Sequence, residues 1–177
     1  MRYVAFLRAI NVGGRTIKMS DLRQHIIDAG FAGVETFIAS GNVIFHADEQ
    51  PRAELAQRIA SHLEQRLGYA VATFVRSSAE VAAIAAHPAF SSTDLAEATA
   101  LNVILHAEPL IPSVTEALFA KRNPIDDFAC HEREVYWLCR KKQSESNFSN
   151  AVFEKLSGVQ GTMRTINTIR TIATKYA

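Results

Sequence analysis

The apolar stretch "YVAFLRAI", residues 3–10, decides the fold of this chain of 177 residues. Its apolar side chains fall on both faces of an extended backbone, a pattern typical of a central strand that is covered on each side. The sequence therefore predicts a sheet built around this strand. Three further strands are expected in the first half of the chain, at "VETFIA" (34–39), "NVIFHA" (42–47) and "YAVATFVR" (69–76).

Two helices separate these strands. The first, "DLRQHIIDAG" (21–30), is expected to be capped by Ser20 and to end at Gly30. The second begins at Pro51 and ends at Gly68, with leucine and isoleucine recurring along one face. The resulting order of elements, βαββαβ, is that of the ferredoxin-like fold.

The second half of the chain repeats this order. After a connecting helix that begins with a capping box at residues 77–80, the polar stretch 91–100 marks a boundary between two domains, 1–90 and 91–177. Residues 101–158 then predict a strand, a helix, a hairpin of two strands and a second helix. We therefore expect an α+β protein with two βαββα(β) ferredoxin-like halves that pack into one compact unit.

The two cysteines belong to the hairpin expected over residues 125–140. Its register pairs Cys130 with Val135 and Cys139 with Asp126, so that the thiols are about four residues apart along the ladder. This separation is well beyond the reach of a disulfide, and we expect both cysteines to be free thiols.

The final stretch, "TMRTINTIRTIATKYA" (162–177), predicts an amphipathic helix. Apolar residues recur at every third position from Met163 to Ile172, whereas a strand would alternate. Thr162 is the expected cap of this helix. Its polar side carries Arg164, Asn167, Thr168 and Arg170.

Charge and composition exclude several classes of function. Nineteen basic and 18 acidic residues leave a net charge of +1, so that no global field attracts nucleic acid or a membrane. No apolar run is long enough to span a bilayer, and the first residues show no signal-peptide pattern, which makes the cytoplasm the expected compartment. The six histidines share no metal-ligand spacing, and we expect neither a metal nor a cofactor.

The stretch "RAINVGGRTIKM" (8–19) is a loop that combines paired glycines with positive charge. Residues 1–18 contain four cations and no acidic residue. The loop lacks the glycine that a Walker motif places before its lysine, and it lacks the third glycine of a dinucleotide fingerprint. What remains is a strand, a Gly-Gly loop, cations and a helix N-terminus, which together can offer amide groups to an anion. The alternative is a turn in which the glycines only allow the bend and the cations are solvated.

Four stretches, "RAINVGGRTIKMSDLR", "FIASGNVIF", "SNFSNAVFEKL" and "TMRTINT", resemble in order the motifs of the family known as domain of unknown function 1697. The chain departs from the family pattern at Ala9, where the family has glycine, and at Thr165 and Ile166, where it has asparagine and tryptophan. The resemblance implies an α+β fold with ferredoxin-like parts, and it implies no activity. The matching positions are Arg8, Asn11, Gly13, Gly14, Ser40, Gly41, Asn42, Thr162, Arg164, Asn167 and Thr168.

Polar, glycine-rich and basic residues on loops are typical of ligand binding rather than of packing. We therefore expect a binding module for a small anionic, phosphate-bearing ligand, formed where the first loop meets the final helix. Two alternatives stay open: an enzyme that acts on a small phosphorylated substrate or nucleotide, and a scaffold for protein interactions. Nucleic acid is a less favoured partner, no membrane partner is expected, and neither catalytic residues nor an oligomeric state follow from the sequence. The expected ligand-binding residues are Arg8, Asn11, Gly13, Gly14, Arg15, Lys18, Ser40, Asn42, Thr162, Arg164, Asn167 and Thr168.

Overall fold

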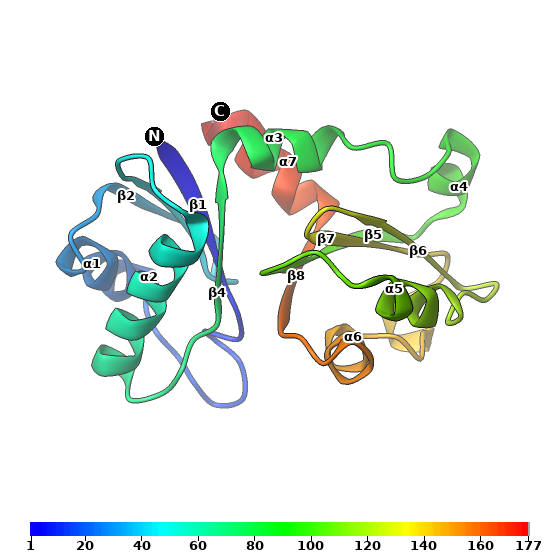
Figure 1. Cartoon of the computed structure of the whole chain (residues 1–177), viewed down its shortest axis with the longest axis horizontal. Helices are drawn as coiled ribbons and strands as arrows, with labels where there is room; N and C mark the ends of the chain where they lie inside the picture. Colours follow the sequence, from blue (N-terminus) through cyan, green and yellow to red (C-terminus); the bar gives the residue numbers. More distant parts are fainter. Residues whose placement is uncertain (177) are drawn as a thin grey trace. The chain divides into compact units, whose positions relative to one another are not determined.

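The computed structural model of the chain describes residues 1–176. The chain divides into two compact units, of which one contains residues 1–83 together with the segment from Ile172 onward, and the other contains residues 84–171. Each unit is built on one four-stranded antiparallel sheet with helices (Figure 1). The predicted α+β class and the two similar halves are confirmed.

The first unit has the predicted order of elements. Its strands follow the order β2-β3-β1-β4 across the sheet, as in a ferredoxin-like βαββαβ fold. The helices α1 and α2 cover one face of this sheet (Figure 1). The elements are β1 (Arg2–Leu7), α1 (Met19–Asp28), β2 (Ala32–Phe37), β3 (Asn42–His46), α2 (Arg52–Leu67), β4 (Thr73–Ser77) and α3 (Ser78–Ala86).

The core of the first unit lies between the sheet and the helices α1 and α2. Tyr3 and Leu7 of β1 belong to the same apolar cluster as Leu55 and Ile59 of α2. All four are fully buried, and each side chain of this kind contributes roughly 1.5–3 kcal/mol when it leaves water. The stripe predicted for α2 is confirmed, and so is the end of the helix at Gly68, whose φ of 76° is left-handed.

The starts of α3 and α1 show where local sequence signals succeed and fail. The capping box of α3 is confirmed: N of Ser77 donates to Oε2 of Glu80 at 2.7 Å, and N of Glu80 donates to Oγ of Ser77 at 3.2 Å. The predicted cap of α1 is wrong, because the helix begins directly after Lys18. Ser20 already lies in the first turn, where its hydroxyl donates to Oδ1 of Asp21 at 3.2 Å.

The second unit repeats the same order, with one strand more than the sequence predicted. Its sheet has the order β6-β7-β5-β8, which matches the first sheet position by position. Its core lies between the sheet and the helices α5 and α6. The elements are α4 (Ser92–Glu97), β5 (Ala100–His106), α5 (Pro112–Phe119), β6 (Asp126–His131), β7 (Glu134–Cys139), the 3-10 helix η1 (Gln143–Glu145), α6 (Asn150–Ser157), β8 (Gly161–Thr165) and α7 (Ile166–Tyr176).

The additional strand β8 corrects the prediction of a helix that starts at Thr162. Residues 161–165 pair with β5, and Arg164 lies opposite Val103. Met163, which took part in the apparent helical repeat, instead packs from the strand against the core. Thr162 and Arg164 are therefore strand residues, because the hydrogen bonds to β5 stabilise an extended backbone that the local pattern does not reveal.

The helical prediction holds from Ile166 onward, where α7 begins. Its first turn is capped by Thr165, whose Oγ1 accepts a hydrogen bond from N of Thr168 at 3.2 Å. Asn167 and Thr168 therefore lie on the helix, as predicted.

The last strands of the two sheets share a repeat at the level of residues. In the first sheet Arg76 of β4 lies opposite Val4 of β1, and in the second Arg164 of β8 lies opposite Val103 of β5. Each arginine is followed directly by a serine or threonine whose hydroxyl caps the next helix. The likeness of the halves thus extends beyond the order of their elements.

The hairpin of β6 and β7 has the predicted register. Cys130 lies opposite Val135, and Cys139 lies opposite Asp126. Both cysteines are free. Burial raises the pKa of the Cys130 thiol to about 11, an effect that the nearby Arg122 only partly offsets, so that this thiol is protonated and a poor nucleophile at neutral pH.

The polar stretch 91–100 contains the helix α4, which the sequence did not predict. Its cap is Ser91, whose Oγ accepts a hydrogen bond from N of Asp94 at 3.1 Å. The compact units divide inside α3, between Ala83 and Ile84. The boundary predicted after residue 90, between two subdomains, stays a prediction.

Candidate functional site

The loop over residues 8–18 joins β1 to α1, and the side chain of Asn11 holds it in place. Nδ2 of Asn11 donates to the carbonyl oxygen of Ala39 at 3.0 Å, and its Oδ1 accepts from N of Ile17 at 2.7 Å. The first bond ties the loop to the turn between β2 and β3, and the second closes the loop on itself. Asn11 therefore gives the loop a fixed base.

The turn between β2 and β3 supports this base through Gly41 and Asn42. N of Leu7 donates to the carbonyl oxygen of Gly41 at 2.8 Å. A Cβ atom at Gly41 would lie 2.7 Å from Cγ2 of Ile10, so that only glycine allows this close approach. Asn42 is buried, and its Nδ2 donates to Oγ of Ser40 at 3.0 Å. These motif residues therefore build the support beneath the loop.

Gly13 and Gly14 form the exposed tip of the loop. Their φ angles are 67° and 84°, which glycine adopts without strain. At either residue, no heavy atom lies within 4 Å of the position that a Cβ atom would occupy, so the space above the backbone is open. Within residues 1–176, no group accepts a hydrogen bond from the amide of either glycine. The tip therefore offers two adjacent N–H donors.

Two exposed cations, Arg15 and Lys18, follow the tip. The guanidinium carbon of Arg15 lies 4.1 Å from the centroid of the Tyr69 ring, a cation–π contact worth about 0.5–1 kcal/mol at an exposed site. The side chain of Lys18 makes no capping bond to α1. Neither cation forms an ion pair with any residue that the structure describes. Arg8 is half-buried, and its backbone N donates to the carbonyl oxygen of Ala72 at 2.9 Å.

The four remaining predicted residues lie in the second unit. Nη1 of Arg164 donates to Oγ1 of Thr162 at 2.9 Å and to the carbonyl oxygen of Met163 at 2.8 Å. Burial lowers the pKa of Arg164 to about 10, so that the guanidinium keeps its charge at neutral pH. Asn167 and Thr168 lie in the first turn of α7. A site shared with the glycine loop stays a prediction from the sequence.

The sequence did not reveal two neighbours of the loop, Ala39 and Tyr69. Ala39 accepts the hydrogen bond of Asn11 from 28 residues further along the chain. Tyr69 lies between α2 and β4, and it comes close to Arg15 only when the sheet has formed, with β4 beside β1. No local spacing could have identified either residue.

Several features of other functional classes are absent from the described part of the chain. Over residues 1–176, no group of three or more His, Cys, Asp or Glu side chains could hold a metal ion. None of the helices in that range has the length and the apolar character needed to cross a membrane. The loop itself, over residues 8–18, contains no His, Cys, Asp or Glu.

Comparisons with known proteins identify a family and a similar fold. The family model described as "Protein of unknown function (DUF1697)" matches residues 1–136. Among solved structures, a conserved bacterial protein from Streptococcus pneumoniae is similar, with a TM-score of 0.76 and 20% identity, covering 98% of this chain and 97% of that chain. At this identity the likeness concerns the fold alone. A search of curated proteins found no match.

Proposed function

Because the chain belongs to the family described as Protein of unknown function (DUF1697), we propose its role from the geometry of the glycine loop: the protein is a binding module for a small phosphate-bearing anion. The observation that carries this proposal is the exposed tip at Gly13 and Gly14, whose amides have no partner within residues 1–176. Arg15 and Lys18 add two cations directly after the tip.

The chemistry of the loop suits phosphate oxygens. Because Gly13 and Gly14 lack a Cβ atom, an oxygen of the ligand can approach their amides within hydrogen-bond distance. Arg15 and Lys18 would add charge-assisted hydrogen bonds, each typically worth about 1.5–3 kcal/mol. Asn11 fixes the base of the loop before binding, which reduces the entropy lost when the ligand arrives.

Binding is favoured over catalysis because the loop lacks the side chains that most often transfer protons. Residues 8–18 contain no His, Cys, Asp or Glu. An enzyme that acts at this loop would need such a group from elsewhere, and no observation identifies one.

Thermal unfolding in the presence of pyrophosphate or ADP tests the proposal. We expect one of these anions to raise the melting temperature, because a ligand specific for the native state adds about 2.7 kcal/mol of stability at 100 times its Kd. Arg15→Ala combined with Lys18→Ala should remove this stabilisation. The unliganded melting temperature should hardly change, since both side chains are exposed.

The matched control is Lys141→Ala combined with Lys142→Ala, which removes the same charge from another exposed pair. This control should keep the stabilisation by the anion. If it loses the stabilisation equally, the effect reflects net charge and not the loop. If neither pyrophosphate nor ADP stabilises the wild type, the glycines serve the turn alone and the proposal is wrong.

A further inference from the structure

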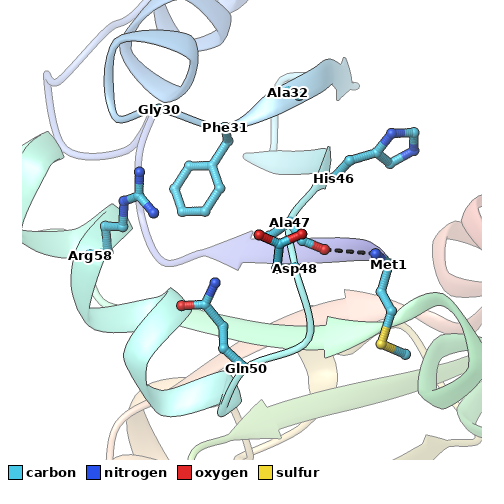
Figure 2. Close-up of a pocket in the computed structure, with 9 residues that line it drawn as sticks. All are labelled: Met1, Gly30, Phe31, Ala32, His46, Ala47, Asp48, Gln50 and Arg58. Carbon is cyan, nitrogen blue, oxygen red and sulfur yellow. Dashed lines mark hydrogen bonds between the residues drawn. The ribbon is translucent and has the colours of Figure 1, made fainter.

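A pocket of about 360 Å³ opens in the first unit (Figure 2). No residue of the glycine loop lines it. It is lined by the junction of α1 with β2, the end of β3, the segment that follows β3, and α2. The glycine loop follows the end of β1, whereas Met1 at the start of β1 lines this pocket. The volume lies at the lower end of the range of small-molecule sites, roughly 300–1,000 Å³.

The guanidinium of Arg58 forms one fixed side of the pocket. Its Nε and Nη2 donate to the carbonyl oxygen of Ala29 at 2.9 and 2.6 Å. The guanidinium carbon lies 4.5 Å from the centroid of the Phe31 ring. A Cβ atom at Gly30 would overlap Nη2, so the glycine makes room for this arrangement. The remaining N–H groups of Arg58 are left for a ligand, in an orientation that the protein already holds.

Asp48 supplies the opposite charge in the same pocket. Figure 2 shows Arg58 and Asp48 with the ring of Phe31 between them in that view. Within residues 1–176, neither side chain forms an ion pair, and Asp48 accepts no hydrogen bond. The N-terminal ammonium of Met1, which donates to the carbonyl oxygen of Ala47 at 2.6 Å, also lines the pocket. The lining therefore holds two cations and one carboxylate, and Arg58 and Asp48 do not neutralise each other.

His46 completes the polar lining. Its Nε2 accepts a hydrogen bond from Nε of Arg2 at 3.2 Å, which leaves Nδ1 to carry the ring proton. A Cβ atom at Gly33 would lie 2.9 Å from this Nδ1, so a second glycine makes room for a side chain of the pocket. Both glycines have positive φ, 86° at Gly30 and 58° at Gly33. The segment between α1 and β2 thus accommodates the two side chains that line the pocket beside it.

We propose that this pocket binds a small zwitterion of the α-amino acid class. The carboxylate of the ligand pairs with Arg58, and its ammonium group pairs with Asp48. A simple cation would meet the repulsion of Arg58 and of the N-terminal ammonium of Met1, and a simple anion would leave Asp48 unpaired, so a molecule with both charges suits the pocket best. The ring of Phe31 lines the pocket, although nearly all of its surface is buried, and it supplies a small apolar contact for the rest of the ligand. This site is independent of the function proposed for the glycine loop.

A titration followed by amide NMR of the labelled full chain tests the proposal. The probes are the standard free L-amino acids, each compared with its N-acetyl and its C-amide derivative. We expect at least one free amino acid to shift the amides of residues 30–32 and 46–50. Both derivatives should bind at least about tenfold more weakly, because each lacks one of the two charges. If no free amino acid shifts these amides, or if the derivatives bind equally well, the proposal is wrong.

Asp48→Asn is the decisive variant, because its exposed carboxylate supports no other described residue. It should weaken binding of the free amino acid about tenfold and leave binding of the N-acetyl derivative unchanged. Glu49→Gln is the matched control: it removes the neighbouring exposed charge, which does not line the pocket, and should bind like the wild type. Wild-type affinity in Asp48→Asn would overturn the proposal. Shifts confined to residues 8–18 would do the same, since they would place the binding at the glycine loop.

Arg58→Gln, compared with Arg66→Gln on the same helix, tests the other charge. Arg58→Gln should abolish the preference for the free acid over its C-amide, and Arg66→Gln should retain it. Because Arg58 also holds the end of α1, we expect its variant to be less stable than the wild type. Where Arg58→Gln does not fold, the Asp48 variant decides.

Discussion

Ala9 has a φ of 54°, in the left-handed region that costs an L-residue other than glycine roughly 1–2 kcal/mol. The family pattern has glycine at this position, and the positive φ explains why, because glycine adopts this angle without strain. The chain therefore stores strain in the loop that contains the proposed anion site. Among the three positions at which the chain departs from the family pattern, Ala9 is the one where the backbone angle itself shows what the substitution costs in stability.

Ala9→Gly should raise the free energy of unfolding by about 0.5–1 kcal/mol, because relief of the strain exceeds the extra entropy that glycine gives the unfolded chain. Urea denaturation measures the change. Ala53→Gly, at an exposed position in the first turn of α2, is the control and should lower the free energy of unfolding by about 0.5 kcal/mol. Equal losses in both variants would show that the left-handed conformation of Ala9 carries no strain.

At the scale of elements, the segment that follows α3 packs against the second sheet through two stacked histidines, His87 and His131. The ring of His87 stacks on that of His131, with centroids 4.1 Å apart, and lies 5.0 Å from the ring of Tyr136. Burial, and secondly the charge of His131, lower the pKa of His87 from its ordinary 6.5. The unfolded chain therefore takes up this proton more readily than the folded chain. This contribution to stability is complete above about pH 6.5 and falls as the pH drops below it.

The free energy of unfolding should accordingly be lower at about pH 5 than at about pH 8, and His87→Phe should make the difference smaller. Phenylalanine keeps a ring for the stack and binds no proton. Urea denaturation at both pH values measures the difference, and the value at the higher pH controls for altered packing. An unchanged difference would show that His87 does not couple folding to pH.

The elements that the sequence predicted are those whose signals are local. The stripe of α2, its glycine end and the capping box at Ser77 each lie within a few neighbouring residues, so their pattern is visible in the chain. The strand β8 was missed because its stability comes from pairing with β5, far away in sequence. The same holds for the candidate site. The exposed glycines were found, whereas Tyr69 reaches Arg15 only through the fold.

At the scale of the whole molecule, the first unit is made of two separate segments of the chain, and the second unit lies between them in the sequence. Residues from Ile172 onward belong to the first unit, although α7 begins in the other. Nη1 of Arg2 donates to the carbonyl oxygen of Tyr176 at 3.0 Å. The rings of Tyr176 and Phe37 contact each other edge-on, with centroids 6.4 Å apart. The first unit is therefore incomplete without these residues.

A chain that stops after Thr171 should lose stability in its first unit. The loss should be about 3–5 kcal/mol, because the buried side chains of Ile172 and Tyr176 are removed. Hydrogen exchange measures it: amides of β1 and β3 should exchange faster. Tyr176→Phe, which keeps the ring and the carbonyl oxygen, is the matched control and should behave like the wild type. Unchanged exchange in β1 and β3 would contradict the prediction.

The assignment of the last segment to the first unit has a consequence for biosynthesis. The ribosome makes residues 172–176 only after the entire second unit, residues 84–171, has been synthesised. At about 5–20 residues per second, the nascent first unit waits roughly 4–18 s for its last segment. During that interval all four strands of its sheet have been translated, but the segment that supplies the buried side chains of Ile172 and Tyr176 has not, so the apolar surface that this segment covers is exposed. The second unit ends at residue 171, directly before this segment, so both units can complete their folds only when residues 84–176 have been translated.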